Sequence, residues 1–213
     1  KPSPSLRSLL FECAQQNPQS CLKVLLSRGV GGRGYTPPIL NQSINEIVSI
    51  HPFPDLYQDW QNHGINLQSS DLFLARQPRL AGIKHCNRLE QVLIKSVPLA
   101  DGYDDWLVLD SKHNIIESSM ANLFFETEVG IVTPKLAYAG VAGMMREQVI
   151  YQLLDMNFTV SITEMNLSNL SNVKHAFMTN SLLGVVDINL IDQHILQKAP
   201  FTSLLRERLN LTL

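Results

Sequence analysis

The sequence has few cysteines, and their spacing excludes several classes of site. Its three cysteines, Cys13, Cys21 and Cys86, show neither a CxxC spacing nor the spacing of zinc ligands, so we expect no metal site. An odd number of cysteines also suits reduced thiols in a cytoplasmic protein better than a disulfide framework. We therefore interpret all three as packing residues.

Charge and long apolar runs are also scarce. The net charge is −2 and no basic cluster occurs, which argues against binding to nucleic acid or to a membrane surface. No apolar run approaches the roughly 20 residues of a membrane-spanning helix, and we recognise no leader of charged and then apolar residues. We expect a small molecule as the binding partner.

The residues that are present predict a mixed α+β fold. With 213 residues, 45% of them hydrophobic, the chain can bury a large core. Expected helices cover residues 4–15, 55–63, 87–97, 143–156 and 201–209. Expected strands cover residues 21–28, 44–50, 65–67, 72–75, 105–110, 115–118, 122–126, 130–133, 158–162, 175–179 and 185–190. Because hairpins join most strands, a doubly wound parallel sheet is not expected.

A domain boundary is expected near two closely spaced prolines. Residues 51–54, His-Pro-Phe-Pro, form a stiff connection in which we expect no regular structure. We therefore predict a small N-terminal domain over residues 1–52, a linker over residues 53–57 and a large domain over residues 58–213.

Four glycines surround a single arginine early in the chain. Gly29, Gly31, Gly32 and Gly34 allow close backbone approach around Arg33. The segment is either a flexible hairpin tip or a loop that presents the arginine to a ligand.

Lys84 comes directly before an amphipathic helix. The apolar residues Leu89, Val92 and Leu93 share one face of that helix. A surface position is the default for a lysine. However, Ile83 and the apolar helix face bracket Lys84, and such an environment favours amine chemistry.

Glu117 and Gly143 complete a set of candidate site residues. Glu117 ends an apolar strand, where a carboxylate needs a cationic partner, either a protonated pyridine nitrogen or a structural arginine. Gly143 opens a helix whose free amides can bind phosphate, although every helix has such an end. With Lys84, these residues can hold a phosphorylated aromatic aldehyde.

Three segments of the sequence form a recognisable set of motifs: residues 117–124 (ESSMANLF), 131–133 (IVT) and 141–146 (VAGMMR). In these segments the sequence resembles the fold-type IV pyridoxal-phosphate enzymes, a family of branched-chain and D-amino-acid aminotransferases and aminodeoxychorismate lyases. Residues 83–93 (IKHCNRLEQVL) and 27–35 (SRGVGGRGY) look most like the lyase branch. The similarity extends from about residue 22 to the C-terminus.

The resemblance implies a cofactor, pyridoxal 5'-phosphate, and a role for each matching residue. Lys84 would carry the cofactor and move protons at the substrate carbon, and Glu117 would pair with the pyridine nitrogen. The implied cofactor-binding residues are Lys84, Arg88, Glu117, Asn122, Gly143, Met144, Met145, Asn180 and Ser181. Arg33 and Tyr35 would bind a substrate that bears carboxylates.

The implied reaction converts 4-amino-4-deoxychorismate into 4-aminobenzoate and pyruvate in folate biosynthesis. The alternatives are a D-amino-acid or branched-chain aminotransferase, or a catalytically inactive fragment. The family resemblance also implies a homodimer in which the glycine-rich loop reaches the neighbouring subunit's pocket. It further implies an upstream segment with a phosphate-binding arginine, which we expect to precede Lys1.

Overall fold

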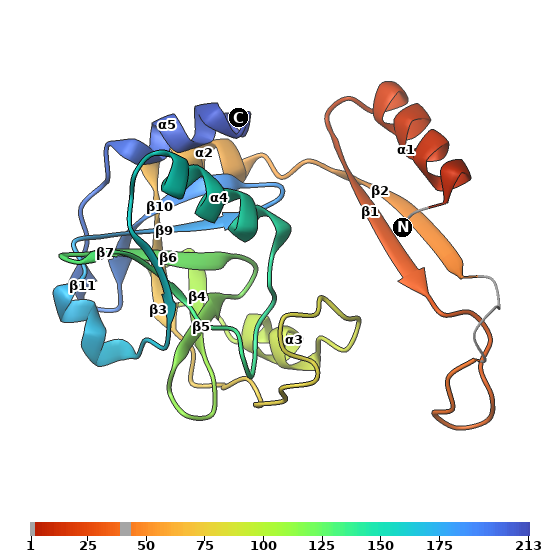
Figure 1. Cartoon of the computed structure of the whole chain (residues 1–213), viewed down its shortest axis with the longest axis horizontal. Helices are drawn as coiled ribbons and strands as arrows, with labels where there is room; N and C mark the ends of the chain where they lie inside the picture. Colours follow the sequence, from red (N-terminus) through yellow and green to blue (C-terminus); the bar gives the residue numbers. More distant parts are fainter. Residues whose placement is uncertain (1–2, 39–43) are drawn as a thin grey trace. The chain divides into compact units, whose positions relative to one another are not determined.

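The computed structural model describes residues 3–38 and 44–213, which fall into two compact units, Lys1–Asp55 and Leu56–Leu213 (Figure 1). The fold is of the mixed α+β kind that the sequence predicts.

The small unit packs one helix on a two-stranded antiparallel ladder. Its elements are α1 (Pro4–Gln16), β1 (Ser20–Ser27) and β2 (Asn45–Pro52). The Ser3 hydroxyl accepts a hydrogen bond from the Leu6 amide and so caps α1. The same hydroxyl donates to Glu46 on β2 at 2.6 Å, and this bond lowers the pKa of the Glu46 carboxyl. Ser3 thus ties the start of the helix to the sheet.

The prediction that residues 51–54 are irregular is wrong in its first half. Strand β2 extends to Pro52, which lies opposite Ser20 at the end of the ladder. A proline is tolerated at the end of an edge strand because its missing N–H removes no interior hydrogen bond.

The large unit is built around a nine-stranded mixed sheet. Its strands are β3 (Ile65–Ser69), β4 (Asp105–Leu109), β5 (Ile115–Ser118), β6 (Asn122–Thr127), β7 (Gly130–Pro134), β8 (Val160–Thr163), β9 (His175–Asn180), β10 (Gly184–Ile191) and β11 (His194–Ile195). The order is β5-β4-β3-β10-β9-β6-β7-β8, with β11 paired to β10. The β3/β10, β3/β4 and β7/β8 pairs are parallel, and the other pairs are antiparallel.

Four α-helices and one 3₁₀ helix accompany this sheet. They are α2 (Leu56–His63), α3 (Leu89–Ser96), α4 (Met144–Asp155), the 3₁₀ helix η1 (Leu167–Asn172) and α5 (Phe201–Arg208). Helices α2, α4 and α5 lie together over one part of the sheet, and α3 lies apart from them beside β4 and β5 (Figure 1).

The core of the large unit consists of two apolar clusters. In the first, Val149 and Leu153 of α4 and Leu205 of α5 pack against Phe124 and Phe177, whose rings stack at 4.9 Å. The second cluster lies under α3 and holds Ile94, Leu74, Trp106, Val108, Ile116 and Ala139. These clusters fix α4 and α3, the two helices that border the site described below.

Two local predictions for the large unit are wrong. Residues 72–75 do not form a strand, because only Leu74 pairs, in an isolated bridge to Asp110. The predicted apolar face of α3 is not buried in this chain either. Leu89, Val92 and Leu93 are half to two-thirds exposed, and α3 instead packs through Ile94.

Across residues 3–38 and 44–213, no helix combines the length and the apolar character needed to cross a membrane. The same residues contain no group of three His, Cys, Asp or Glu side chains arranged to hold a metal ion.

Candidate active site

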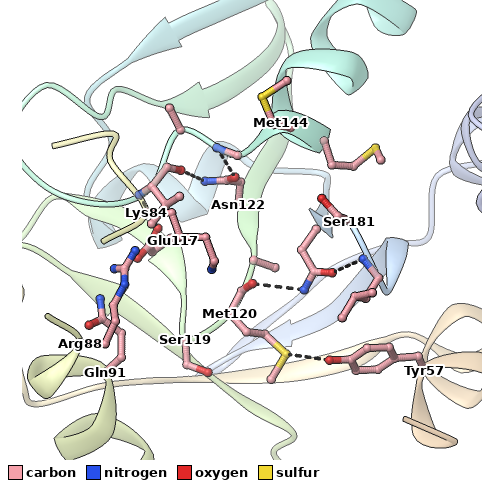
Figure 2. Close-up of a pocket in the computed structure, with 17 residues that line it drawn as sticks. Tyr57, Lys84, Arg88, Gln91, Glu117, Ser119, Met120, Asn122, Met144 and Ser181 are labelled. Carbon is pink, nitrogen blue, oxygen red and sulfur yellow. Dashed lines mark hydrogen bonds between the residues drawn. The ribbon is translucent and has the colours of Figure 1, made fainter. Parts of the chain in front are cut away.

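A cavity of about 590 Å³ in the large unit brings together the residues that the sequence indicated for the cofactor. It is bordered by the start of α4, the first turns of α3, the β5–β6 connection and the turn after β9 (Figure 2). The indicated residues that line it are Lys84, Arg88, Glu117, Asn122, Gly143, Met144, Met145, Asn180 and Ser181. Arg33 and Tyr35 belong to the small unit, where both are exposed.

Glu117 is the buried carboxyl group of the cavity. It is 6% exposed at the end of β5, and its Oε2 accepts a hydrogen bond from the Val141 amide at 2.8 Å. Burial raises the pKa of this carboxyl above its ordinary value. The Val141 hydrogen bond, the charges of Arg88 and Lys84, and a hydrogen bond from Gln91 oppose that rise. The carboxyl is thus placed where a cationic partner in the cavity would strongly favour its charged form.

The loop that carries Lys84 pairs with residues 140–142, and the same residues donate a hydrogen bond to Glu117. The Gly82 amide donates to the Gly140 carbonyl at 2.9 Å, and the Ala142 amide donates to the Gly82 carbonyl at 3.1 Å. Because Val141 lies between these two partners and donates to Glu117, one backbone pairing sets the position of both functional groups. In Figure 2, Lys84 lies next to Glu117.

The surroundings of Lys84 differ from the prediction in one respect. Ile83 is 53% exposed and Leu89 is 64% exposed, so the expected apolar bracket around Lys84 is not formed within this chain. The neighbours of Lys84 in the cavity are polar instead, namely Glu117, Arg88 and Gln91 (Figure 2).

The wall of the cavity at the start of α4 is suited to an anion. Gly143 is the N-cap of α4, and the first amides of a helix have no partner within the helix. The Gly143 amide donates to Asn122 Oδ1 at 3.2 Å, and the Asn122 side-chain amide donates to the Val141 carbonyl at 2.7 Å. A Cβ atom at Gly143 would lie 2.3 Å from Asn122 Oδ1, so a glycine is required for this close approach. The amides of Met144 and Met145 are therefore available at a positive helix end.

The turn after β9 lines the cavity together with the start of α4. The Asn180 side chain accepts from the amides of Leu182 and Leu183 and donates to the Met120 carbonyl. Asn180 thus shapes the turn, and Ser181 directs an exposed hydroxyl group toward the cavity (Figure 2).

Two residues of the quoted motifs hold α4 in place and do not line the cavity. The Arg146 guanidinium donates to Thr133 Oγ1 at 3.2 Å and to the Pro134 carbonyl at 3.1 Å. The Thr133 hydroxyl in turn donates to the Leu123 carbonyl at 2.8 Å. Burial lowers the pKa of Arg146. Arg146 and Thr133 connect α4 to β7 and β6, and so position the helix end.

The structure adds cavity residues that the sequence did not single out. Gln91 lies one helical turn after Arg88, so its i+3 spacing was the available signal. Ser119 stands inside the 117–124 motif and lines the cavity too. Tyr57 donates a hydrogen bond to the sulfur of Met120 at 3.6 Å, a contact between α2 and the β5–β6 connection that carries no local sequence signal.

Comparison with known proteins gives a consistent assignment. Residues 2–191 match the amino-transferase class IV family. The chain is 36% identical over 191 residues to an aminodeoxychorismate lyase from Vibrio harveyi, a match that covers 88% of this chain and 70% of that protein.

Solved structures are similar over nearly the whole chain. The 4-amino-4-deoxychorismate lyase from Pseudomonas aeruginosa has a TM-score of 0.89 at 30% identity, covering 97% of this chain and 76% of that one. A branched-chain amino acid aminotransferase from T.th., complexed with N-(5'-phosphopyridoxyl)-L-glutamate, has a TM-score of 0.75 at 23% identity, covering 95% and 67%, and shows the same fold. The family match over residues 2–191 and the match to the Vibrio harveyi lyase confirm the family resemblance, and this protein belongs to the class IV aminotransferase family of pyridoxal-phosphate enzymes.

Proposed function

We propose that the protein is a lyase that converts 4-amino-4-deoxychorismate into 4-aminobenzoate and pyruvate, a step of folate biosynthesis. The observation that carries this proposal is the 36% identity to the Vibrio harveyi lyase over 88% of the chain. The cavity around Lys84 and Glu117 supports it, since an amine and a buried carboxyl group are the two groups that this chemistry requires.

The cavity residues fit pyridoxal phosphate. Lys84 supplies the amine that would carry the cofactor, and Glu117 supplies a buried carboxyl group for its ring nitrogen. The first amides of α4 and the Ser181 hydroxyl supply donors for its phosphate. Once bound there, pyridoxal phosphate withdraws electrons from the carbon that bears the substrate's amine.

Each of these residues then has a defined task. Lys84 removes a proton from the substrate carbon that bears the amine, acting as a general base. Glu117, held by the Val141 amide, supplies the negative charge that keeps the ring nitrogen protonated. The Arg88 charge and the Gln91 hydrogen bond favour the ionised form of Glu117. The bond between the ring carbon and the ether oxygen then breaks, which makes the ring aromatic. The released enolpyruvate takes up a proton on carbon and becomes pyruvate.

The substrate carries carboxylates, and we propose Arg33 and Tyr35 among its binding residues. Both side chains are exposed in the glycine-rich loop of the small unit, and Gly34 adopts a φ of 72°, a conformation that residues with a Cβ atom rarely adopt. A planar guanidinium group can hold a carboxylate with two hydrogen bonds.

We also propose that the protein is a homodimer in the cytoplasm. Leu89, Val92 and Leu93 leave an apolar face of α3 exposed by 64%, 58% and 50%, which suits contact with a second copy. The free Cys13 and Cys21 suit a reducing compartment. Light scattering at working concentration tests the dimer, and a monomer would contradict it.

Product analysis tests the lyase. The purified protein should release pyruvate and 4-aminobenzoate in equal amounts from 4-amino-4-deoxychorismate without a keto-acid acceptor. Turnover that strictly requires 2-oxoglutarate would establish an aminotransferase instead. An absorbance spectrum without a cofactor band, after incubation with pyridoxal phosphate, would establish an inactive fragment.

A further inference from the structure

We propose that Lys95 binds a carboxylate group of the substrate at the edge of the cavity, and that Ser119 and Asp105 hold its ammonium group in place. The inference rests on the proposed function, because it assigns a contact to one of the carboxylates of that substrate. It concerns three residues of the large unit, on α3, β4 and the β5–β6 connection.

The three side chains form one hydrogen-bonded group. The Ser119 hydroxyl donates to Asp105 Oδ1 at 2.5 Å and accepts from Lys95 Nζ at 3.2 Å. Lys95 Nζ lies 3.6 Å from the same Asp105 oxygen. Asp105 is fully buried, whereas Ser119 lines the cavity. A buried carboxylate thus holds the end of a long, flexible side chain within one hydrogen bond of the cavity wall.

The ammonium group of Lys95 retains capacity for a ligand. A lysine has three donors, and Ser119 accepts one of them. The Lys95 side chain is 51% exposed and, unlike its partner Ser119, does not line the cavity itself, so a carboxylate can approach its ammonium group from solvent at the cavity edge. Ser119 cannot donate a hydrogen bond to a substrate carboxylate, because its only hydroxyl hydrogen is donated to Asp105. The Ser119 oxygen can then only accept hydrogen bonds.

The other cationic groups of the cavity lie near Glu117, and one guanidinium nitrogen of Arg88, Nη2, is buried there without a hydrogen-bond partner in the part of the chain that the structure describes. Among residues 56–213, the lysine and arginine that line the cavity are Lys84 and Arg88, and both act on Glu117. Lys95 follows Arg88 by two turns of α3, a separation of about 10 Å along the helix axis. A substrate that reacts beside Lys84 and carries a carboxylate at its far end would therefore meet Lys95.

Calorimetric titration of the cofactor-loaded protein with isophthalate, an aromatic dicarboxylate, tests this assignment. Lys95→Met should weaken isophthalate binding by about 10-fold or more, because a charge-assisted hydrogen bond is lost. Lys95→Arg keeps the charge and should stay within about 3-fold of the unchanged protein. Lys112→Met is the matched control, because Lys112 is an exposed lysine in the β4–β5 turn. The Lys112→Met variant should bind isophthalate with the affinity of the unchanged protein.

Two further readouts separate a binding role from a structural one. Lys95→Met should keep the cofactor absorbance band, and in the steady state it should raise KM while kcat stays nearly constant. Ser119→Ala should weaken isophthalate binding less than Lys95→Met does. It removes the hydrogen bond that positions the Lys95 ammonium group but keeps the positive charge of Lys95. The assignment would be overturned if Lys95→Met bound isophthalate with unchanged affinity, or if Lys112→Met lost as much isophthalate affinity as Lys95→Met does. It would also be overturned if the unchanged protein did not bind isophthalate. Isophthalate binding through Lys95 in a protein that releases no pyruvate would contradict the proposed function alone.

Discussion

Replacement of Glu117 by glutamine isolates the charge of the buried carboxyl group. Glutamine keeps the shape of the side chain and an oxygen that can accept from the Val141 amide, now 2.8 Å away. The variant should therefore retain its cavity and its cofactor. It lacks the negative charge, and Arg88 and Lys84 are left without the anion that they now face.

The expected rate loss follows from the burial of this charge. Glu117 is 6% exposed, so water cannot replace the lost interaction. A preorganised electrostatic partner in such a site contributes about 3–4 kcal/mol to the transition state, which corresponds to a fall in kcat on the order of 10² to 10³. Pyruvate release measures kcat, and the absorbance band of the cofactor measures its retention. Glu164→Gln is the control, because Glu164 is exposed and lies away from the cavity. A Glu117→Gln protein with unchanged kcat would refute the assigned role of the carboxylate.

The Glu117→Gln variant should also change how the free energy of unfolding depends on pH. Burial raises the pKa of Glu117 above its ordinary value of 4.5, so between the two pKa values the folded protein binds more protons than the unfolded chain. The free energy of unfolding of the cofactor-free protein therefore falls as pH rises through and above 4.5. Glutamine does not titrate and so removes this dependence. The free energy of unfolding of Glu117→Gln, measured with denaturant, should therefore increase relative to that of the unchanged protein as the pH is raised from about 4 to about 7. A difference independent of pH would contradict the burial argument.

Three further predictions concern the remaining parts of the site. Borohydride reduction should fix the cofactor to Lys84, and peptide mass mapping that finds it on another lysine would overturn the assignment. Arg33→Ala should raise the apparent KM by about 10- to 100-fold with a nearly constant kcat, because the carboxylate contact is shared by ground and transition states; a large fall in kcat alone would argue against substrate binding. Gly143→Ala should weaken the affinity for pyridoxal phosphate, measured by equilibrium titration, because its Cβ would approach Asn122 Oδ1 to 2.3 Å; wild-type affinity would show that the helix end does not depend on this approach.

Those parts of the fold that depend on local pattern could be predicted from the sequence. The hairpin of β4 and β5 has a polar turn between two apolar runs, and the structure contains it. Helix α2 ends at Gly64, whose φ of 76° is the expected helix-ending conformation. The parallel pairing of β3 with β10 had no such signal, because it joins residues more than one hundred positions apart.

The site could be predicted only as a set of separate motifs. Lys84 and Glu117 were singled out from their local sequence surroundings, and the family resemblance implied their roles. Their common attachment to residues 140–142 could not be predicted, because it depends on backbone pairing. The exposed face of α3 shows the limit of periodicity. Its pattern correctly marked Leu89, Val92 and Leu93 as apolar but could not tell whether their partner lies in this chain.

The strand order has a consequence for the synthesis of the chain. Strand β10 lies between β3 and β9, and so it joins a half-sheet of β5, β4 and β3 to one of β9, β6, β7 and β8. Both half-sheets precede β10 in the sequence, and neither can bury its inner edge until β10 leaves the ribosome. The turn between β9 and β10 also borders the cavity, and it is held from both sides only when β10 has paired with β9. Completion of the sheet in the large unit therefore waits for the synthesis of β10, and the high sequence separation of the β3/β10 contact favours slow folding.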